Sequence, residues 1–269
     1  MGEVKDFILL IPYYNDFEGL IESLKSIKYP FDKFEVLVVD DGSKVPLSLA
    51  HLQNLFPETE IKVINLPLNV GIAKALNSGL REILNRTDYK YIARLDCGDT
   101  CDIERFTKQV QFMNTHEDIG LLGTWCTFTD KGSGKSYVYK TKLTHNEIIK
   151  EMHFKCSFIH PTVMFRREVL EKVGLYPENY PHTEDYAYFW KILKYYTAAI
   201  LPLYLVDVST GKNTVSFSNR KEQLIWRKKI VSEMSSDRIN KISAFFYLTI
   251  LSIIPGNLIY LLKFKLLEK

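Results

Sequence analysis

The sequence predicts an α/β protein built on a mixed, mostly parallel sheet flanked by helices, followed by an apolar helical tail. Short, uninterrupted apolar runs alternate with helix-patterned segments in the first half of the chain, and such runs are typical of parallel strands buried on both faces. Polar side chains follow each run, as expected where an open sheet binds a ligand beyond the carboxyl ends of its strands. A long uncharged segment near the C-terminus indicates the tail.

The first half of the chain contains the parallel strands and the helices that connect them. Each strand is an apolar run rich in β-branched or aromatic residues, and the connecting segments have the apolar spacing of amphipathic helices. The expected strands cover residues 7–12, 34–40, 61–66 and 89–96, and the expected helices cover residues 17–28, 46–56, 71–86 and 102–116. This alternation predicts a parallel sheet with helices on both faces.

The second half is less regular and is expected to extend the same sheet. Residues 119–130 and 135–140 flank the glycine-rich "KGSG" and predict a β-hairpin. Helices are expected over residues 145–154, 165–174 and 183–196, the second of them ended by Gly174, and a strand over residues 198–208. We therefore expect one domain over residues 1–208 and a basic, apolar helical extension over residues 209–269.

Composition and charge are those of an ordinary globular protein. The chain is 46% apolar and 25% charged, and its net charge of +3 does not indicate nucleic acid as a partner. The four cysteines match neither a zinc knuckle nor a thioredoxin-type pair, and no secretory signal begins the sequence. These features predict free thiols and a cytoplasmic location.

The apolar tail has three interpretations, which the sequence leaves open. Residues 242–262 carry no charge and are long enough for a membrane span, which needs about 20 apolar residues. Pro255, Gly256 and Asn257 interrupt this segment, so two short helices lying in the membrane interface, or two core helices, fit it as well. Basic residues gather here, from "RKK" at residues 227–229 to Lys263 and Lys269. This gradient favours the inner face of a membrane with anionic lipids as the partner of the tail.

Polar residues follow each of the first strands where it ends. They are Tyr13, Tyr14 and Asn15 after the first strand, Asp40, Asp41 and Ser43 after the second, Asn69 and Gly71 after the third, and Asp96 and Asp99 after the fourth. Parallel strands bring these residues to one edge of the sheet. There an aromatic ring can stack on a base, a carboxylate can accept hydrogen bonds from base or ribose, and paired aspartates can hold a divalent cation. The set suits a nucleotide.

The chain resembles the family-2 glycosyltransferases of the GT-A fold. The matching motifs are "IPYYN", "VVDDGS", "NVGIAKALNSGL", "ARLDCGD", "HPTVMFRR" and "TEDYAYFW", and the resemblance spans residues 7–208. It implies an inverting enzyme that uses a nucleotide-sugar donor. The residues it places around the donor are Pro12, Tyr14, Asn15, Asp40, Asp41, Asn69, Lys74, Asn77, Asp96 and His160.

The resemblance also implies a catalytic base. Asp185, the second acid of "TED", corresponds to that base, and Glu184 beside it is the second candidate. The same stretch makes a sound helix start, with Thr183 as the N-cap and acids in the first turn. Both interpretations can hold together.

The expected metal site departs from the family pattern. The family holds Mg²⁺ or Mn²⁺ with an Asp-x-Asp element, and the position of its second aspartate is Gly98 here. Asp99 follows three residues after Asp96, and residues i and i+3 of a turn lie within about 7 Å at Cα. We therefore expect Asp96 and Asp99 to be the metal ligands.

These features predict an enzyme that moves a sugar from a nucleoside diphosphate, UDP or dTDP, to a saccharide or lipid-linked acceptor in cell-surface polysaccharide synthesis. Gly98 also fits a non-catalytic, membrane-tethered binding module that has lost its metal site. A third hypothesis is that the chain is a nucleotidyltransferase on a similar sheet. Such an enzyme needs a glycine-rich, basic phosphate loop, and "IPYYNDFEG" is not one.

Overall fold

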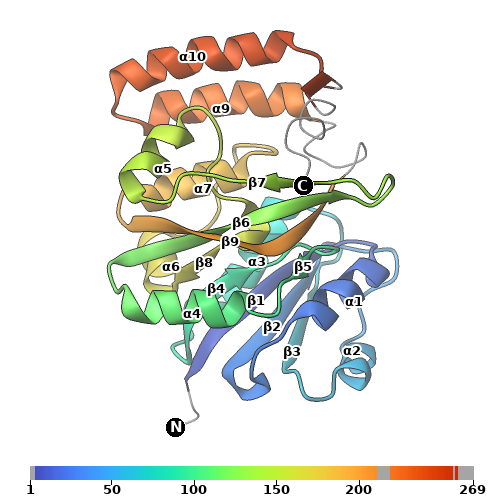
Figure 1. Cartoon of the computed structure of the whole chain (residues 1–269). Coiled ribbons are helices and arrows are strands. Elements are labelled where there is room, and N and C mark those ends of the chain that lie inside the picture. The colour runs from blue at the N-terminus through green and yellow to red at the C-terminus, as the bar shows by residue number, and fades with distance from the viewer. Residues whose placement is uncertain (1–3, 211–218, 257, 260–269) are drawn as a thin grey trace.

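The computed structural model describes residues 4–210, 219–256 and 258–259, and these form one mixed sheet of nine strands with helices on both faces (Figure 1). The strands are β1 (Lys5–Tyr13), β2 (Phe34–Asp40), β3 (Ile61–Asn65), β4 (Tyr89–Arg94), β5 (Thr100–Cys101), β6 (Ile119–Asp130), β7 (Ser136–Tyr139), β8 (Met164–Arg166) and β9 (Thr197–Thr210). The helices are α1 (Phe17–Ser26), α2 (Leu49–Leu55), α3 (Ile72–Leu84), α4 (Arg105–Thr115), α5 (His145–Met152), α6 (Arg167–Val173), α7 (Glu184–Leu193), α9 (Arg220–Met234) and α10 (Arg238–Ile253), with 3₁₀ turns η1 (Phe31–Lys33) and η2 (His160–Thr162).

The first half has the predicted parallel arrangement, in the order β3-β2-β1-β4. Alternate residues of β1 enter two different cores: Ile8 and Leu10 pack with α3, whereas Phe7, Leu9 and Ile11 pack with α1 and α4. All five side chains are fully buried. The uninterrupted apolar run was therefore a correct sign of a strand that is covered on both faces.

The second half extends the sheet. The predicted hairpin is confirmed, since β6 and β7 pair in antiparallel register, and β9 runs parallel to β6. The three-residue strand β8 enters between β4 and β6 in antiparallel register. It was not predicted, because three residues of the motif "HPTVMFRR" are too short to show a periodic pattern.

The sheet curls so that its far edge returns to the end of β4. Strand β5 follows the turn after β4 at once, yet it pairs with β9, Thr100 opposite Asp207 and Cys101 opposite Val206. The turn over residues 95–99 therefore crosses from the middle of the sheet to its far edge. This crossing decides how the carboxylates of the turn are oriented.

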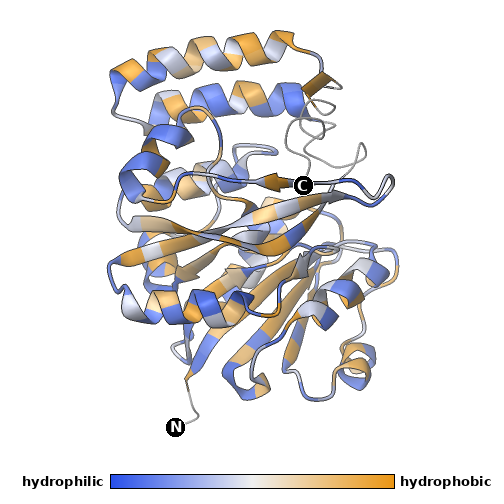
Figure 2. Ribbon diagram, viewed as in Figure 1, coloured by the Kyte–Doolittle hydropathy of each residue, from blue (hydrophilic) through white to orange (hydrophobic). Residues whose placement is uncertain are grey.

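The C-terminal extension forms a helical layer of its own. Helix α9 packs on α7, and α10 covers α9 at the top of Figure 1. Figure 2 shows hydrophobic residues all along α10. Within the described part of the chain no helix is both long and apolar enough to cross a bilayer. Residues 260–262 of the predicted apolar segment, Asn257 and the terminal lysines Lys263, Lys265 and Lys269 lie outside the described residues.

Candidate functional site

Loops that follow β1, β2 and β3 are tied together at the carboxyl edge of the sheet. The amide of Asn15 donates to the Ser43 hydroxyl at 2.9 Å, and the Asn15 side chain accepts from the amide of Lys44 at 2.9 Å. Asp40 accepts from the amides of Ser43 and Leu47 at 2.9 and 3.0 Å. These bonds fix the geometry of the "DDGS" loop beside the end of β1.

Asp41 links this loop to the next strand end. Its two carboxylate oxygens accept from the amides of Val70 and Gly71 at 2.8 and 3.0 Å, and the residue is only 5% exposed. Gly42, with φ of +70°, lies so close to Leu68 that any side chain would collide with the Leu68 backbone. Asp41 thus shapes the loop that the sequence places around a nucleotide, and contact with a base remains a prediction.

Of the other residues predicted to bind the donor, three are exposed near this edge and one, Pro12, belongs to a strand. Tyr14 is half exposed, and Asn69 and Lys74 lie on the surface near the same edge, available to a ligand. Pro12 is part of β1, in register with Val39.

The side-chain amide of Asn77 is buried in a tertiary contact. Its Nδ2 donates to the Tyr176 carbonyl and to Glu178, each at 2.9 Å, and its Oδ1 accepts from the Tyr176 amide at 2.9 Å. Asn77 is 1% exposed. Asn77 therefore fixes α3 against the segment after α6, and a role for it in the donor pocket stays a prediction.

A buried arginine organises the end of β4. Arg94 is fully buried, and its Nη2 donates to Asp96 Oδ1 at 2.6 Å while its Nε faces His160 Nε2 at 3.3 Å. The Tyr176 hydroxyl lies 2.9 Å from the same His160 nitrogen. Burial and the Arg94 charge hold the pKa of His160 well below its usual value, so the ring is neutral and Nε2 is an acceptor. Asp96, whose side chain keeps 31% exposure, is the carboxylate of this group that reaches solvent.

The turn after β4 forms as predicted, but the Asp99 side chain points elsewhere. The Asp99 amide donates to the Asp96 carbonyl at 3.1 Å, and Gly98 takes a φ of +90°. Asp99 Oδ1 accepts from the Ser209 amide of β9 at 2.8 Å, and the residue is 4% exposed. Burial and the nearby Asp96 raise the pKa of Asp99 well above its ordinary value, which favours the neutral form.

The expected two-carboxylate metal site stays a prediction, because one oxygen of its second ligand, Asp99, is already engaged by the Ser209 amide. No group of three candidate metal ligands occurs among the described side chains, and the Asp99 carboxyl is held by β9. The cause is the β5–β9 pairing, which begins at the next residue and draws Asp99 into the sheet. Asp96 remains a candidate ligand, and no step below is routed through a metal.

The two acids of "TED" lie at the start of α7, with Thr183 as the N-cap as predicted. Burial, together with the Asp185 charge, raises the pKa of Glu184 to about 7. Burial, together with the Asp96 charge, raises the pKa of Asp185 to about 6, although a 2.6 Å hydrogen bond from the Tyr186 amide opposes the rise. Asp96 acts on both acids, so the structure brings the end of β4 and the start of α7 to one site.

One residue near this site was missed. Arg227 of α9 lies with its guanidinium 5.4 Å from the centre of the Tyr186 ring and donates to the Phe154 carbonyl. In the sequence it belongs to "RKK", which we interpreted as a membrane-facing charge. The available signal was its spacing: Arg227 lies three residues after Leu224 and four before Val231, both buried, so it is a cation on the inner face of a helix.

Comparison with known proteins identifies the family. The model of "Glycosyl transferase family 2" matches residues 8–174. The chain is 30% identical over 219 residues to the amylovoran biosynthesis glycosyltransferase AmsE of Erwinia amylovora, covering 78% of each protein. It is 29% identical over 175 residues to an Escherichia coli UDP-Gal:alpha-D-GlcNAc-diphosphoundecaprenol beta-1,3-galactosyltransferase, covering 65% of this chain and 62% of that protein.

Solved structures share the fold. TarS 1-349 of S. aureus in complex with UDP-GlcNAc superposes with a TM-score of 0.68 at 19% identity, covering 90% of this chain and 70% of that one. The mannosyltransferase PcManGT of Pyrobaculum calidifontis, in complex with GDP-Man and Mn²⁺, gives a TM-score of 0.65 at 17% identity, covering 90% and 69%. With the family match over residues 8–174 and the sheet described above, these comparisons show that the chain belongs to the family-2 glycosyltransferases, with a GT-A-like fold.

Proposed function

We propose that the chain transfers a sugar, with inversion, from a UDP-sugar to a saccharide or lipid-linked acceptor, and that Asp185 is its general base. The observation that carries this proposal is the pair of acids at the start of α7, which share the carboxyl edge of the sheet with Asp96. The names of the relatives support the substrates: one acts in amylovoran biosynthesis, and another uses UDP-Gal and a diphosphoundecaprenol-linked acceptor.

The base must take a proton from the acceptor hydroxyl as that hydroxyl attacks the sugar carbon and the nucleoside diphosphate leaves. With a pKa raised to about 6, Asp185 is largely ionised at neutral pH and more basic than an ordinary aspartate, as general-base catalysis favours. Glu184, with a pKa of about 7, is protonated in a larger fraction of molecules. One carboxylate suffices, because direct displacement forms no covalent glycosyl-enzyme.

The donor end of the site rests on the loops tied by Asn15, Asp40 and Asp41. Tyr14 is proposed to stack on the base, and the Arg94–Asp96 pair with neutral His160 is proposed to border the diphosphate. Mg²⁺ or Mn²⁺ stays a proposed cofactor with Asp96 as its one supported ligand, and the resemblance to the Mn²⁺-bound mannosyltransferase supports the fold alone.

The test is turnover of a panel of UDP-sugars and dTDP-sugars by the purified chain, with and without Mn²⁺, in the wild type, D185N and E184Q. We expect D185N to lose a factor of about 10² or more in transfer, the usual size of a general-base contribution, while UDP affinity is kept. E184Q should retain most of the activity. A D185N variant with wild-type turnover removes Asp185 from the role, and a chain that binds UDP-sugars but turns none over supports the non-catalytic binding module.

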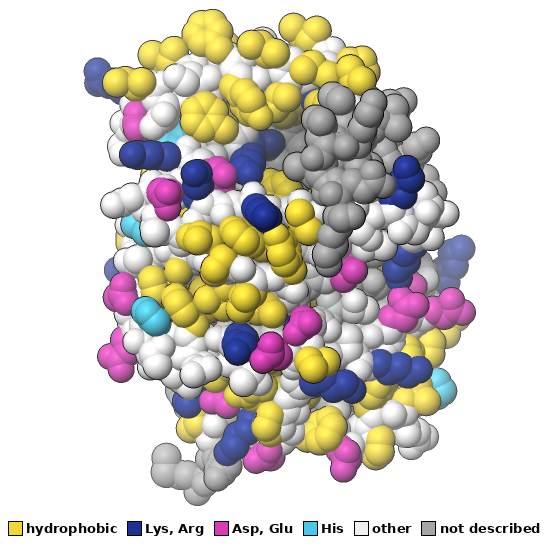
Figure 3. Space-filling model, in the orientation of Figure 1, with side chains coloured by type: hydrophobic (Ala, Val, Ile, Leu, Met, Phe, Trp, Pro, Cys, Tyr) yellow, Lys and Arg dark blue, Asp and Glu magenta, His cyan; other side chains and the backbone are white. Residues whose placement is uncertain are grey.

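We also propose that α10 rests on the surface of an anionic membrane. Ala244 and Leu248 are the buried positions on its inner face, and its outer face exposes a stripe of large apolar side chains at helical spacing. The stripe consists of Ile239, Ile242, Phe246, Ile250 and Ile253, exposed by 61 to 78%. Hydrophobic surface gathers at the top of Figure 3, where α10 lies. A helix that is apolar on both faces is expected to be covered on both.

The charges around α10 favour a lipid surface as the cover. Lys228 and Lys241 border a groove of about 160 Å³ between α9 and α10, whose other walls include Phe245 and Leu248. Cations next to an apolar helix face bind anionic headgroups while the apolar side chains enter the interface. A lipid-linked acceptor would then be presented on the same surface that holds the enzyme.

Flotation with vesicles of phosphatidylglycerol and phosphatidylcholine tests this docking. We expect the wild type to float with the anionic vesicles at low salt, and F246E/I250E to stay at the bottom. I103E is the control, since Ile103 is 67% exposed but lies before α4. A wild type that does not float, or that forms a dimer which F246E/I250E dissociates, contradicts the membrane proposal.

A further inference from the structure

We propose that Arg227 completes the candidate site from outside the segment that the family model matches: it is a positioning residue, whose cation α9 holds over the ring of Tyr186, beside Asp185, where it assists that carboxylate as the base. The inference rests on the proposed role of Asp185 as the base. It also gives the C-terminal extension a part in the reaction, whether or not a membrane is present.

The contacts of α9 hold Arg227 at the start of α7. The guanidinium lies over the ring of Tyr186, the residue that follows Asp185, with 5.4 Å to its centre. Its Nη2 donates to the Phe154 carbonyl after α5. Gln223, one turn earlier on α9, donates to the His182 carbonyl at 3.1 Å, just before the N-cap of α7. Helix α9 is therefore fixed just before the N-cap of α7 and over Tyr186, the residue that follows the two acids.

The charges that act on Asp185 come from several elements. Glu184 is its neighbour on α7, Asp96 approaches from the end of β4, and Cys156 and Tyr176 are neutral groups that interact with it from two loops. Burial and Asp96 favour the protonated form of Asp185, whereas Arg227 lowers the pKa of Asp185. Removing this cation is expected to leave a base that holds its proton to higher pH.

One hydrogen-bonding atom of Arg227 also lacks a partner. Its Nε is buried and makes no hydrogen bond within the described structure. Buried donors in native proteins are nearly always satisfied, so an arginine with a purely structural role would be expected to use this atom. The unpaired Nε is a second sign that the structural contacts of Arg227 do not by themselves account for this residue.

The experiment compares R227M, which removes the charge, with R227K, which keeps it, and with K229M as the matched control. Lys229 lies two residues later on α9, and its ammonium pairs with Glu233 at 3.9 Å while its side chain is 49% exposed. The assay is hydrolysis of UDP-galactose, or of whichever UDP-sugar of the panel turns over, by the full-length chain between pH 5 and 8. Water is the acceptor, so the proton passes from water to the base and UDP leaves. UDP affinity is measured alongside by calorimetry.

We expect the acid limb of the wild-type profile to have its midpoint near 6, and R227M to shift this midpoint upward. A shift of one pH unit lowers the rate on the acid limb about tenfold. R227K and K229M should match the wild type, and all variants should bind UDP within about twofold of it, since Arg227 is assigned to the base and not to the donor. If R227M does not fold, R227Q takes its place.

An acid limb that R227M or R227Q leaves unshifted overturns the inference, and so does a loss of rate that weaker UDP binding accounts for in full. D185N in the same assay separates this result from a failure of the proposed function. A D185N variant with wild-type activity refutes the base itself. A D185N variant without activity, together with an unshifted R227M profile, refutes the role of Arg227 alone.

Discussion

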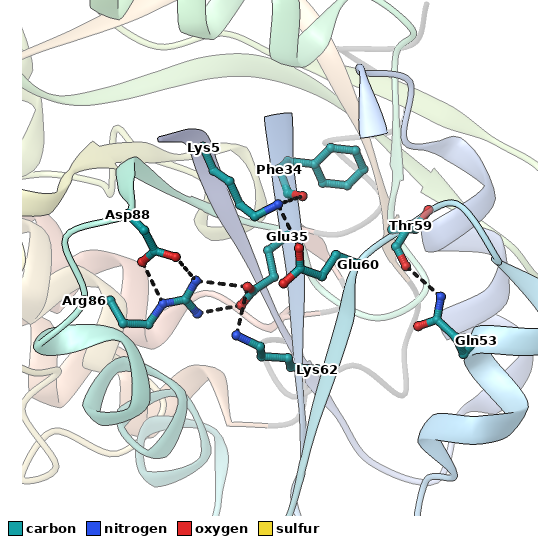
Figure 4. A network of polar contacts seen from close by, with 9 residues as sticks. All are labelled: Lys5, Phe34, Glu35, Gln53, Thr59, Glu60, Lys62, Arg86 and Asp88. Atoms are coloured by element: carbon teal, nitrogen blue, oxygen red, sulfur yellow. Dashed lines mark hydrogen bonds and ion pairs between the residues drawn. The ribbon is translucent and has the colours of Figure 1, made fainter. Parts of the chain in front are cut away.

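A buried glutamate clamps the amino ends of the parallel strands, at the edge opposite the candidate site (Figure 4). Glu35 of β2 is fully buried, and its carboxylate accepts two hydrogen bonds from the Arg86 guanidinium, at 2.7 and 3.0 Å. The ammonium of Lys62 of β3 lies 3.0 Å from the same carboxylate. Arg86 also pairs with Asp88 before β4 at 2.9 Å. Burial alone would raise the pKa of Glu35, but the hydrogen bonds from Arg86 and Lys62 outweigh it and lower that pKa.

Replacing Arg86 by methionine removes the main partner of Glu35 and leaves the negative charge of its carboxylate buried and only partly paired. Breaking a buried ion pair by removing one partner costs about 3–5 kcal/mol. We expect R86M to lose about 3 kcal/mol, the lower end of that range, because Lys62 still pairs with Glu35 but is partly screened by solvent. For a chain of this size the loss corresponds to a fall of roughly 6–12 °C in Tm. E35Q/R86M should recover about half of the loss, because no charge is then left buried.

The assay is urea unfolding followed by tryptophan fluorescence, at pH 7.5 and at pH 5. K90M is the control, since Lys90 pairs with Asp6 at the same edge but is 47% exposed, and it should cost about 0.5 kcal/mol or less. The folded-state pKa of Glu35 is lowered, so its stabilising contribution is present above the unfolded pKa and is lost as pH falls through the folded one. That loss lies below the pH range of the assay, but in R86M the Glu35 carboxylate stays buried without its main partner, and burial then raises its pKa. The variant can therefore take up a proton between pH 7.5 and pH 5, and the R86M penalty must shrink on acidification. A penalty no larger than that of K90M, or a double variant no more stable than R86M, refutes this reasoning.

The remaining predictions concern the turn after β4 and the "DDGS" loop. D99N should be at least as stable as the wild type at pH 7.5, because an asparagine amide can still accept the hydrogen bond from the Ser209 amide, and the carboxyl that it replaces has a raised pKa that disfavours its charged form. The gain in Tm should grow as pH rises. A loss of Mn²⁺ stimulation in D99N would show instead that Asp99 turns toward a metal. G42A should weaken UDP binding by tenfold or more in calorimetry, because its Cβ would lie 2.2 Å from the Leu68 carbonyl carbon. G134A, at a φ of +69° with open space around it, is its control and should cost about 1 kcal/mol without affecting UDP; equal UDP binding in both would contradict the packing argument.

Local pattern was enough for most of the fold. Strand β1 could be predicted because its apolar run is longer than any turn, and the β6–β7 hairpin because glycines mark its loop. Strands β5 and β8 were missed, since two and three residues carry no period. The same limit applies to Asp99. Its place in a turn was predictable from spacing, but the direction of its side chain depends on Ser209, 110 residues away in the sequence.

The sequence by itself determined the family, the parallel half of the sheet and the edge at which the acids gather, because each of these follows from short-range periodicity and from the order of strands. Tertiary structure alone decided which of those acids stay accessible, what surrounds the base and what α9 contributes. These properties come from contacts between segments far apart in the chain, the pairing of β5 with β9 and the packing of α9 on α7. Burial and charge proximity, which set the pKa of each carboxyl, exist only after those segments meet.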